Sequence, residues 1–102
     1  MEGSSLRERC YRLISRIPRG RVTTYKEVAE ALGIRGYRVV GRLLSRNPRP
    51  VEIPCHRVVK SNGEVGGYVM GVKKKIELLR SEGIPVENGK IVNFQEYFFR
   101  LK

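Results

Sequence analysis

The sequence has few of the residues that form metal sites and disulfides, and it lacks the apolar segments that cross membranes or direct secretion. It contains one histidine and two cysteines, Cys10 and Cys55, which do not have the spacing of a zinc site. No run approaches the roughly 18 apolar residues that cross a bilayer, and no start typical of a signal peptide is present. We therefore expect no bound metal, no disulfide and no membrane association, and a cytoplasmic protein at the nucleoid, or a nuclear one in a eukaryote.

Acidic residues are also scarce. The 102 residues include 10 Asp and Glu against 21 Lys and Arg, which gives a formal net charge of +11. A field of that sign concentrates polyanions, so nucleic acid is the expected partner, although a solvated basic surface is the alternative. The length suits a single domain over residues 1–102 with one modest core.

The first periodic segment, residues 5–17, predicts an amphipathic helix. Its apolar residues recur at the helical spacing, and Ser5 with Glu8 forms a capping-box pattern at its start. Cys10 lies on the apolar face, which indicates a small buried side chain rather than a reactive one.

The next two segments predict a helix-turn-helix. Thr24 and Glu27 form a second capping-box pattern before a short helix that ends at Gly33. A third helix is expected after Gly36, running to about Ser45. Two short helices joined by a glycine-containing turn are typical of this DNA-binding motif.

Four arginines lie beside the apolar face of the third predicted helix. On a helical wheel Arg35, Arg38, Arg42 and Arg46 fall within about 80° of one another, with no acidic residue among them. A solvated charged face is one interpretation. Contact with DNA phosphates, which arginine binds with two parallel hydrogen bonds, explains the stripe better.

The second half of the chain predicts short β elements around one further helix. Residues 51–53 are expected as a short strand, residues 84–92 as a hairpin centred on Asn-Gly that could serve as a wing, and residues 94–101 as an amphipathic turn. A helix over 71–82 should point Val72, Ile76 and Leu79 inward and Lys73, Lys74 and Lys75 outward or to the flanks. The expected fold is mainly α with short β elements, a winged helix-turn-helix-like domain.

Cys55 stands beside His56, the only histidine of the chain. A thiol reacts as the thiolate and needs a nearby base or cation. Neighbouring side chains on extended backbone point to opposite faces, so a Cys–His contact requires a turn after Pro54 or a bridging water. The histidine would also need an acid to orient it. Four carboxylates remain open for that role: Glu52, Glu64, Glu77 and Glu82. Taken singly, either residue of the pair suits an inert structural role.

The chain resembles the active-site and DNA-binding domain of the O6-alkylguanine-DNA alkyltransferases, the methylated-DNA–protein-cysteine methyltransferases, over roughly residues 5–100. The resemblance rests on several separated motifs in the same order, chiefly residues 54–58 (PCHRV). The others are residues 20–25 (GRVTTY), 38–41 (RVVG), 47–48 (NP), 61–63 (SNG), 66–68 (GGY) and 82–83 (EG).

The resemblance implies irreversible transfer of an alkyl group, such as methyl, from O6-alkylguanine in double-stranded DNA to Cys55. The protein would act once, as a monomer, without a metal or an organic cofactor. The helix-turn-helix would engage the minor groove, and the damaged guanine would be flipped out of the stack, where a thiolate can reach it. Arg38 resembles the finger that fills the vacated gap, with Arg35 and Arg42 as further DNA contacts. Tyr25 would press on the adjacent phosphate and bond the flipped base, and Gly41 would permit close approach to the groove.

The resemblance also implies how the thiol loses its proton. Glu82 becomes the preferred acid, acting with His56 and a bridging water. Asn47 would tie the third helix to the active-site segment through side-chain hydrogen bonds. The base edge would be contacted in the pocket by the carbonyls of Cys55 and Val58 and the N–H of Val69, which follows the pocket residue Tyr68.

Three departures from the family pattern bear on these expectations. The family's usual N-terminal domain is absent from this sequence. Val69 and Met70 are bulkier than the small residues frequent after the pocket tyrosine, which predicts a narrower pocket. Alkyltransferase-like proteins, which share the fold, replace the cysteine, typically with tryptophan, whereas Cys55 is retained. A non-catalytic DNA-damage sensor or helix-turn-helix DNA-binding protein remains the alternative function.

Overall fold

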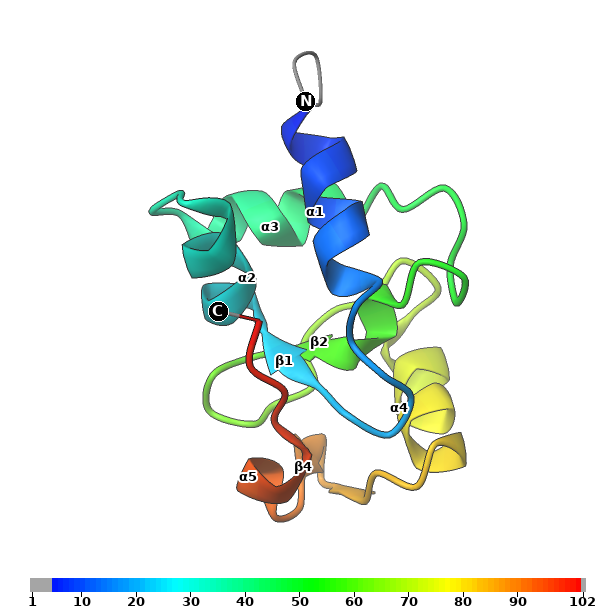
Figure 1. The fold of residues 1–102 in the computed structure, drawn as a ribbon. Helices are drawn as coiled ribbons and strands as arrows, with labels where there is room; N and C mark the ends of the chain where they lie inside the picture. The colour runs from blue at the N-terminus through cyan, green and yellow to red at the C-terminus, as the bar shows by residue number, and fades with distance from the viewer. Residues whose placement is uncertain (1–4, 102) are drawn as a thin grey trace.

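The computed structural model describes residues 5–101, which form five α-helices, a single 3₁₀ turn and two pairs of very short strands. Helices α1, α2 and α3 lie together at one end, a hairpin and α5 lie at the other, and β1 and β2 lie between them (Figure 1). None of the helices in residues 5–101 has the length and apolarity needed to cross a bilayer. In chain order the elements are α1 (Leu6–Ile14), β1 (Thr23–Thr24), α2 (Tyr25–Leu32), α3 (Tyr37–Leu44), η1 (Cys55–Arg57), β2 (Val58–Val59), α4 (Val72–Ser81), β3 (Val86–Glu87), β4 (Lys90–Ile91) and α5 (Phe94–Tyr97).

Helix α1 begins with the predicted capping box and ends earlier than predicted. The Ser5 hydroxyl accepts a hydrogen bond from the N–H of Glu8, and the Glu8 carboxylate accepts one from the N–H of Ser5. The helix stops at Ile14 because the next N–H groups close tighter turns, with Ile17 donating to the Ile14 carbonyl at 3.0 Å. That turn still buries Ile17, so the apolar periodicity continues beyond the helix itself. Cys10 is buried, as predicted.

Helices α2 and α3 form the predicted helix-turn-helix. The Thr24 hydroxyl accepts a hydrogen bond from the N–H of Glu27 at the start of α2, and Gly33 ends the helix at φ 76°. The Glu27 carboxylate also accepts a hydrogen bond from the Leu101 N–H at 2.7 Å. This hydrogen bond holds the C-terminal segment against the first turn of α2.

The predicted stripe of four arginines is only partly helical. Helix α3 begins at Tyr37 and is capped by Ser45, so Arg38 and Arg42 project from the helix. Arg35 lies in the preceding turn and Arg46 in the following one, where the helical spacing used for the prediction does not apply. All four side chains are exposed.

A parallel pairing of β1 with β2 joins the two halves of the chain and was not predicted. Thr23 pairs with Val58, and Thr24 pairs with Val59. Because successive side chains of a strand point to opposite faces, Val58 and Val59 enter different apolar clusters. The first cluster lies among α1, α2 and α3, and the second lies against α4 and the hairpin.

The predicted strand over residues 51–53 is wrong. The segment is a turn in which the Ile53 N–H donates to the Arg49 carbonyl at 2.9 Å and Val51 has φ 78°. A β-branched residue rarely adopts that conformation, so strand propensity does not set the backbone here.

The predicted hairpin is confirmed. Val86 pairs with Ile91 and Glu87 with Lys90, and the two turn residues Asn88 and Gly89 both have positive φ, as a type I′ turn requires. The hairpin lies at the end of the molecule away from α3 (Figure 1).

Helix α4 forms as predicted, but Val72, expected inward, is exposed, and Lys75, expected outward or flanking, is buried. Val72 is 45% exposed, and Lys75 is fully buried. Lys75 lies four residues before the buried Leu79, so both project from one face of the helix. The ammonium group is accommodated there because backbone carbonyls surround it, as described below.

The capping box predicts the stability effect of a single surface substitution. Ser5→Ala should lower the free energy of unfolding by about 1 kcal/mol, because the N–H of Glu8 loses its acceptor. A melting temperature about 4–8 °C lower should be measured by circular dichroism. Ser61→Ala, at an exposed serine without such a role, is the control and should stay within about 0.5 kcal/mol. Equal effects of the two substitutions would contradict the cap.

Candidate active site

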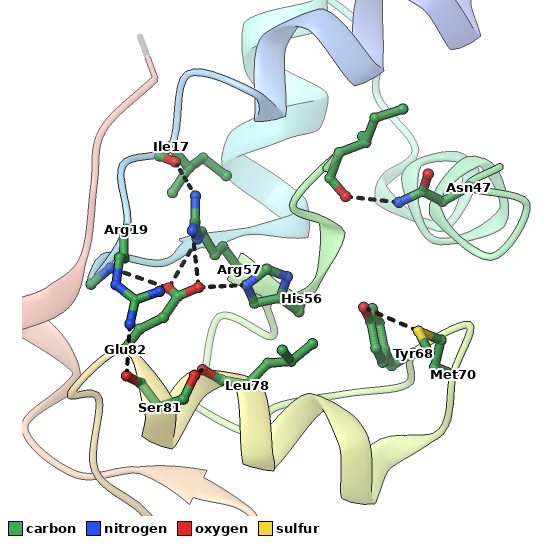
Figure 2. A network of polar contacts seen from close by, with 12 residues as sticks. Ile17, Arg19, Asn47, His56, Arg57, Tyr68, Met70, Leu78, Ser81 and Glu82 are labelled. Atoms are coloured by element: carbon green, nitrogen blue, oxygen red, sulfur yellow. Dashed lines mark hydrogen bonds and ion pairs between the residues drawn. The ribbon is translucent and has the colours of Figure 1, made fainter. Parts of the chain in front are cut away.

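Cys55 is buried at the start of the 3₁₀ turn η1, immediately after Pro54. The Asn47 side chain lies beside it and donates from Nδ2 to the Cys55 Sγ at 3.1 Å and to the Ile53 carbonyl at 2.8 Å. Figure 2 shows Asn47 projecting toward the active-site segment from the region that follows α3. One buried amide therefore fixes both the thiol and the backbone that carries it.

The surroundings of Cys55 act on its pKa in opposite directions. Burial raises the pKa of the Cys55 thiol, while the Asn47 hydrogen bond and the positive charge of Lys75 lower it, and burial prevails. The thiol is therefore protonated at neutral pH, and its reaction requires a proton acceptor. Burial raises the pKa of Cys10 to about 11, which makes that thiol inert.

The turn after Pro54 sends the His56 side chain toward Glu82. The His56 Nε2 lies 2.8 Å from the Glu82 Oε2, and the imidazole is fully buried. The other three carboxylates considered from the sequence are exposed at the surface. Glu52 pairs with Arg49, Glu64 pairs with Lys60, and Glu77 lies on the outer face of α4.

Glu82 is held ionised by its neighbours. Burial alone would raise the pKa of this carboxyl group, but hydrogen bonds from Arg57 and His56 prevail and lower it to about 2. Arg57 binds both carboxylate oxygens at 2.9 Å and donates to the Ile17 carbonyl at 2.8 Å (Figure 2). The Gly20 N–H donates to the Glu82 Oε1 at 3.2 Å.

This arrangement selects one tautomer of His56. Burial lowers the pKa of His56 more than Glu82 raises it, so the ring is neutral at neutral pH. Because Glu82 is ionised and accepts, Nε2 carries the proton and Nδ1 is a free acceptor. Nδ1 is buried and has no hydrogen-bond partner among residues 5–101. The site therefore contains a basic nitrogen that is ready to accept a proton.

A pocket of about 250 Å³ lies next to Cys55. Tyr68 stands at its side with its ring edge-to-face to His56, at a centroid distance of 6.3 Å. Val69 lines the pocket as expected, whereas Met70 does not and has its sulfur 3.9 Å from the Tyr68 hydroxyl. The lining residues are Tyr25, Gly41, Leu44, Ser45, Cys55, Gly67, Tyr68 and Val69.

The loop over the pocket approaches Tyr25 closely. Gly66 has φ 76°, and a Cβ built on it would lie 3.1 Å from the Tyr25 hydroxyl oxygen, so both backbone conformation and contact require glycine. The Tyr25 hydroxyl lies 3.5 Å from the Gly67 carbonyl, to which it can donate. Burial raises the pKa of Tyr25 to about 12, so this hydroxyl keeps its proton at neutral pH.

Lys75 belongs to the site although it was expected on the outside of α4. Its Nζ donates to the Val58 carbonyl at 2.7 Å, to the Gly67 carbonyl at 3.0 Å and to the Tyr25 hydroxyl at 3.4 Å. Burial lowers the pKa of Lys75 to about 7. The residue fastens the pocket loop to β2, and its position four residues before Leu79 was the sequence signal for its burial.

A wider groove of about 580 Å³ adjoins the pocket on the side of α3. Tyr25, Gly41 and Gly67 line both hollows, so the groove opens into the pocket. Arg38 lines the groove, while Arg35 and Arg42 lie outside both hollows on the surface. The structure thus brings most predicted site residues together around Cys55. The three predicted arginines do not line the pocket itself.

No cluster of three or more His, Cys, Asp or Glu side chains that could hold a metal ion occurs within residues 5–101. The Cys55 Sγ accepts a hydrogen bond from Asn47, and the His56 Nε2 is hydrogen-bonded to Glu82.

Comparison with known proteins agrees with the fold and the motifs. A methylated-DNA–protein-cysteine methyltransferase of Pyrobaculum aerophilum is 60% identical over 67 residues, which are 66% of this chain and 45% of that protein. The crystal structure of the O6-methylguanine-DNA methyltransferase of Pyrococcus kodakaraensis KOD1 superposes with a TM-score of 0.73 at 37% identity, covering 80% of this chain and 48% of that one.

A second solved structure matches along nearly its whole length. It is S. pombe Atl1 in complex with damaged DNA containing O6-carboxymethylguanine, with a TM-score of 0.83 at 25% identity, covering 98% of this chain and 99% of that one. By contrast, the chain spans 31% to 49% of the length of four curated relatives that it matches.

The family model for the 6-O-methylguanine DNA methyltransferase DNA-binding domain matches residues 5–84. These residues include the helix-turn-helix, the pocket and the complete Cys55–His56–Glu82 region. The fold class and the family resemblance predicted from the sequence are confirmed: the chain belongs to the 6-O-methylguanine DNA methyltransferase family, to its DNA-binding domain.

Proposed function

We propose that this protein repairs DNA by irreversible transfer of an alkyl group from O6-alkylguanine to Cys55. One observation carries the proposal: a buried cysteine lines a pocket beside a neutral histidine whose buried Nδ1 has no hydrogen-bond partner among the described residues. That combination supplies a nucleophile, a proton acceptor and space for a base within a DNA-binding family. We expect the protein to act once, as a monomer, without a metal or an organic cofactor.

The first step in the proposed reaction removes the thiol proton. A water bridging the Cys55 Sγ and the His56 Nδ1 passes the proton to the imidazole, and the ionised Glu82 stabilises the resulting imidazolium. Asn47, which already donates to the Sγ, stabilises the thiolate as it forms. The sulfur then attacks the alkyl carbon as the carbon–O6 bond breaks, and guanine leaves with the electron pair.

The polar groups of the pocket suit a purine edge. The Val58 carbonyl uses one lone pair for Lys75 and retains a second, and the Val69 N–H has no hydrogen-bond partner among residues 5–101. The neutral Tyr25 hydroxyl, whose contact with the Gly67 carbonyl is long at 3.5 Å, can turn its proton to the base instead. We assign these groups to the flipped base, with the Cys55 carbonyl as a further acceptor.

The groove beside α3 suits the DNA strand that delivers the base. A Cβ on Gly41 would meet no atom of the protein within 4 Å, so internal packing does not require glycine at that position. Close approach of the minor groove would require it. We expect Arg38, which lines the groove, to fill the vacated stack, and the exposed Arg35 and Arg42 to contact phosphates.

A non-catalytic DNA-damage sensor is the second candidate. The near-complete mutual coverage with the Atl1 structure favours it. The retained Cys55 favours transfer, because alkyltransferase-like proteins, which share the fold, replace this cysteine, typically with tryptophan.

Mass spectrometry of the intact protein tests the transfer. After incubation with a duplex containing one O6-methylguanine, the reduced protein should gain the mass of one methyl group, located on Cys55. Cys55→Ala should gain nothing while binding the same duplex with similar affinity. An unchanged mass for the fresh protein, with DNA binding intact, would instead support the damage sensor.

The pH dependence of the transfer rate tests the proton acceptor. Since burial holds the pKa of His56 below its ordinary value of about 6.5, the rate should stay level down to that pH and fall only when the imidazole becomes protonated. Glu82→Gln should slow transfer about 10²-fold, because the imidazolium loses its charged partner. The matched control is Glu77→Gln on the exposed face of α4, which should react normally. A Glu82→Gln protein that reacts at the parent rate would contradict the role of Glu82.

Comparison of duplex DNA with a free alkylated base tests Arg38. Arg38→Ala should reduce the rate on duplex at least about tenfold, a loss of about 1.4 kcal/mol, because the flipped state loses the group that fills the stack. The rate on free O6-methylguanine should hardly change. Arg35→Ala, outside α3, should weaken binding alike for damaged and undamaged duplex. Equal losses on duplex and free base for Arg38→Ala would refute this role.

A further inference from the structure

Tyr37 is the most exposed large apolar side chain in residues 5–101, at 56% exposure. It is the first residue of α3, and its N-cap, Gly36, has no side chain that could cover the ring. The Tyr37 hydroxyl makes no hydrogen bond with any other described residue. Neither packing nor a polar contact within the described fold accounts for an aromatic residue at this position.

A single exposed aromatic residue is by itself unremarkable in a protein surface, but the neighbours of Tyr37 are not those of an ordinary surface. The ring lines the groove beside the Cys55 pocket, next to Arg38. Two further cationic side chains, Lys26 and Lys60, line the same groove, and its one acidic residue, Glu64, pairs with Lys60 at 3.6 Å. Proteins that bind unstacked nucleic-acid bases commonly combine a positively charged groove with aromatic side chains on which the bases stack.

The groove leads directly into the pocket, because Tyr25, Gly41 and Gly67 line both. A strand that sends one nucleotide into the pocket must therefore pass its neighbouring nucleotides along the groove. This step rests on the proposed function, in which the alkylated nucleotide is extruded toward Cys55.

We propose that Tyr37 is a second DNA wedge, which stacks on a base beside the site of extrusion while Arg38 fills the gap. Successive side chains of a helix point about 100° apart around its axis, so Tyr37 and Arg38 cannot occupy the same gap. Tyr37 would therefore contact a base pair next to the one that Arg38 replaces. Extrusion unstacks the flanking bases, and a flat ring inserted from the minor groove replaces part of the lost stacking. Tyr37 would thus favour the flipped state over the closed duplex.

Binding measurements in the Cys55→Ala background isolate this role from alkyl transfer. The probe is a duplex with one O6-methylguanine and 2-aminopurine at an adjacent position, compared with the same duplex carrying guanine. Tyr37→Ala and Tyr37→Leu should each weaken binding of the alkylated duplex about tenfold, whereas Tyr37→Phe should stay within about twofold. The leucine variant keeps an apolar side chain but removes the flat stacking face, while the phenylalanine variant removes only the hydroxyl.

The fluorescence of 2-aminopurine gives a second readout. With the parent protein and Tyr37→Phe the signal on binding should be quenched by stacking, and with Tyr37→Ala it should rise. Undamaged duplex should be bound with nearly equal affinity by all variants, and their melting temperatures should agree because Tyr37 is exposed.

Two results would overturn the wedge: unchanged affinity and fluorescence in Tyr37→Ala, or a leucine variant that behaves like phenylalanine. Neither depends on whether the parent protein transfers a methyl group. A parent protein that shows the Tyr37-dependent binding but no mass gain would refute the proposed reaction and leave the wedge supported.

Discussion

The candidate site depends on the buried carboxylate of Glu82. This one group, at the C-terminal end of α4, accepts hydrogen bonds from the Gly20 N–H, from His56 and from both ends of the Arg57 guanidinium. It therefore joins the loop after α1, the active-site turn and α4, which are far apart in the sequence (Figure 2). With its side chain only 4% exposed, the charge is tolerable only because its partners compensate it, so loss of one partner would leave a buried charge incompletely compensated.

The same carboxylate sets the chemical state of the pair beside it. A neutral acid at position 82 could donate to His56 and leave the tautomer undecided, whereas the ionised group can only accept. The imidazole proton is thereby held at Nε2, and Nδ1 is left basic. Burial meanwhile keeps the Cys55 thiol protonated. Under the proposed reaction, in which Cys55 acts once, this arrangement would be an advantage, because a resting thiol is less open to oxidation than a thiolate.

Local patterns predicted local structure well. Ser5 with Glu8, and the Asn88-Gly89 turn, specify their surroundings through contacts within a few residues, and both formed as predicted. Predictions failed where distant parts of the chain decide the outcome. The partners of Lys75 come from β2 and the pocket loop, and the parallel pairing of β1 with β2 joins segments on either side of the helix-turn-helix. The residues alone left four acids open for His56; only the family resemblance pointed to Glu82.

The placement of the thiol relative to α3 explains how one fold can serve both transfer and mere recognition. Helix α3 contributes Tyr37, Arg38 and Gly41 to the groove, while Cys55 and His56 belong to η1. The loop between these elements is short and rich in proline, and Asn47 connects it to the Ile53 carbonyl and the Cys55 Sγ. Replacing the sulfur would remove one acceptor of Asn47 and leave the backbone acceptor in place. The groove thus depends little on the sulfur atom, and under the proposed function the retained sulfur is what would turn capture of a damaged nucleotide into repair.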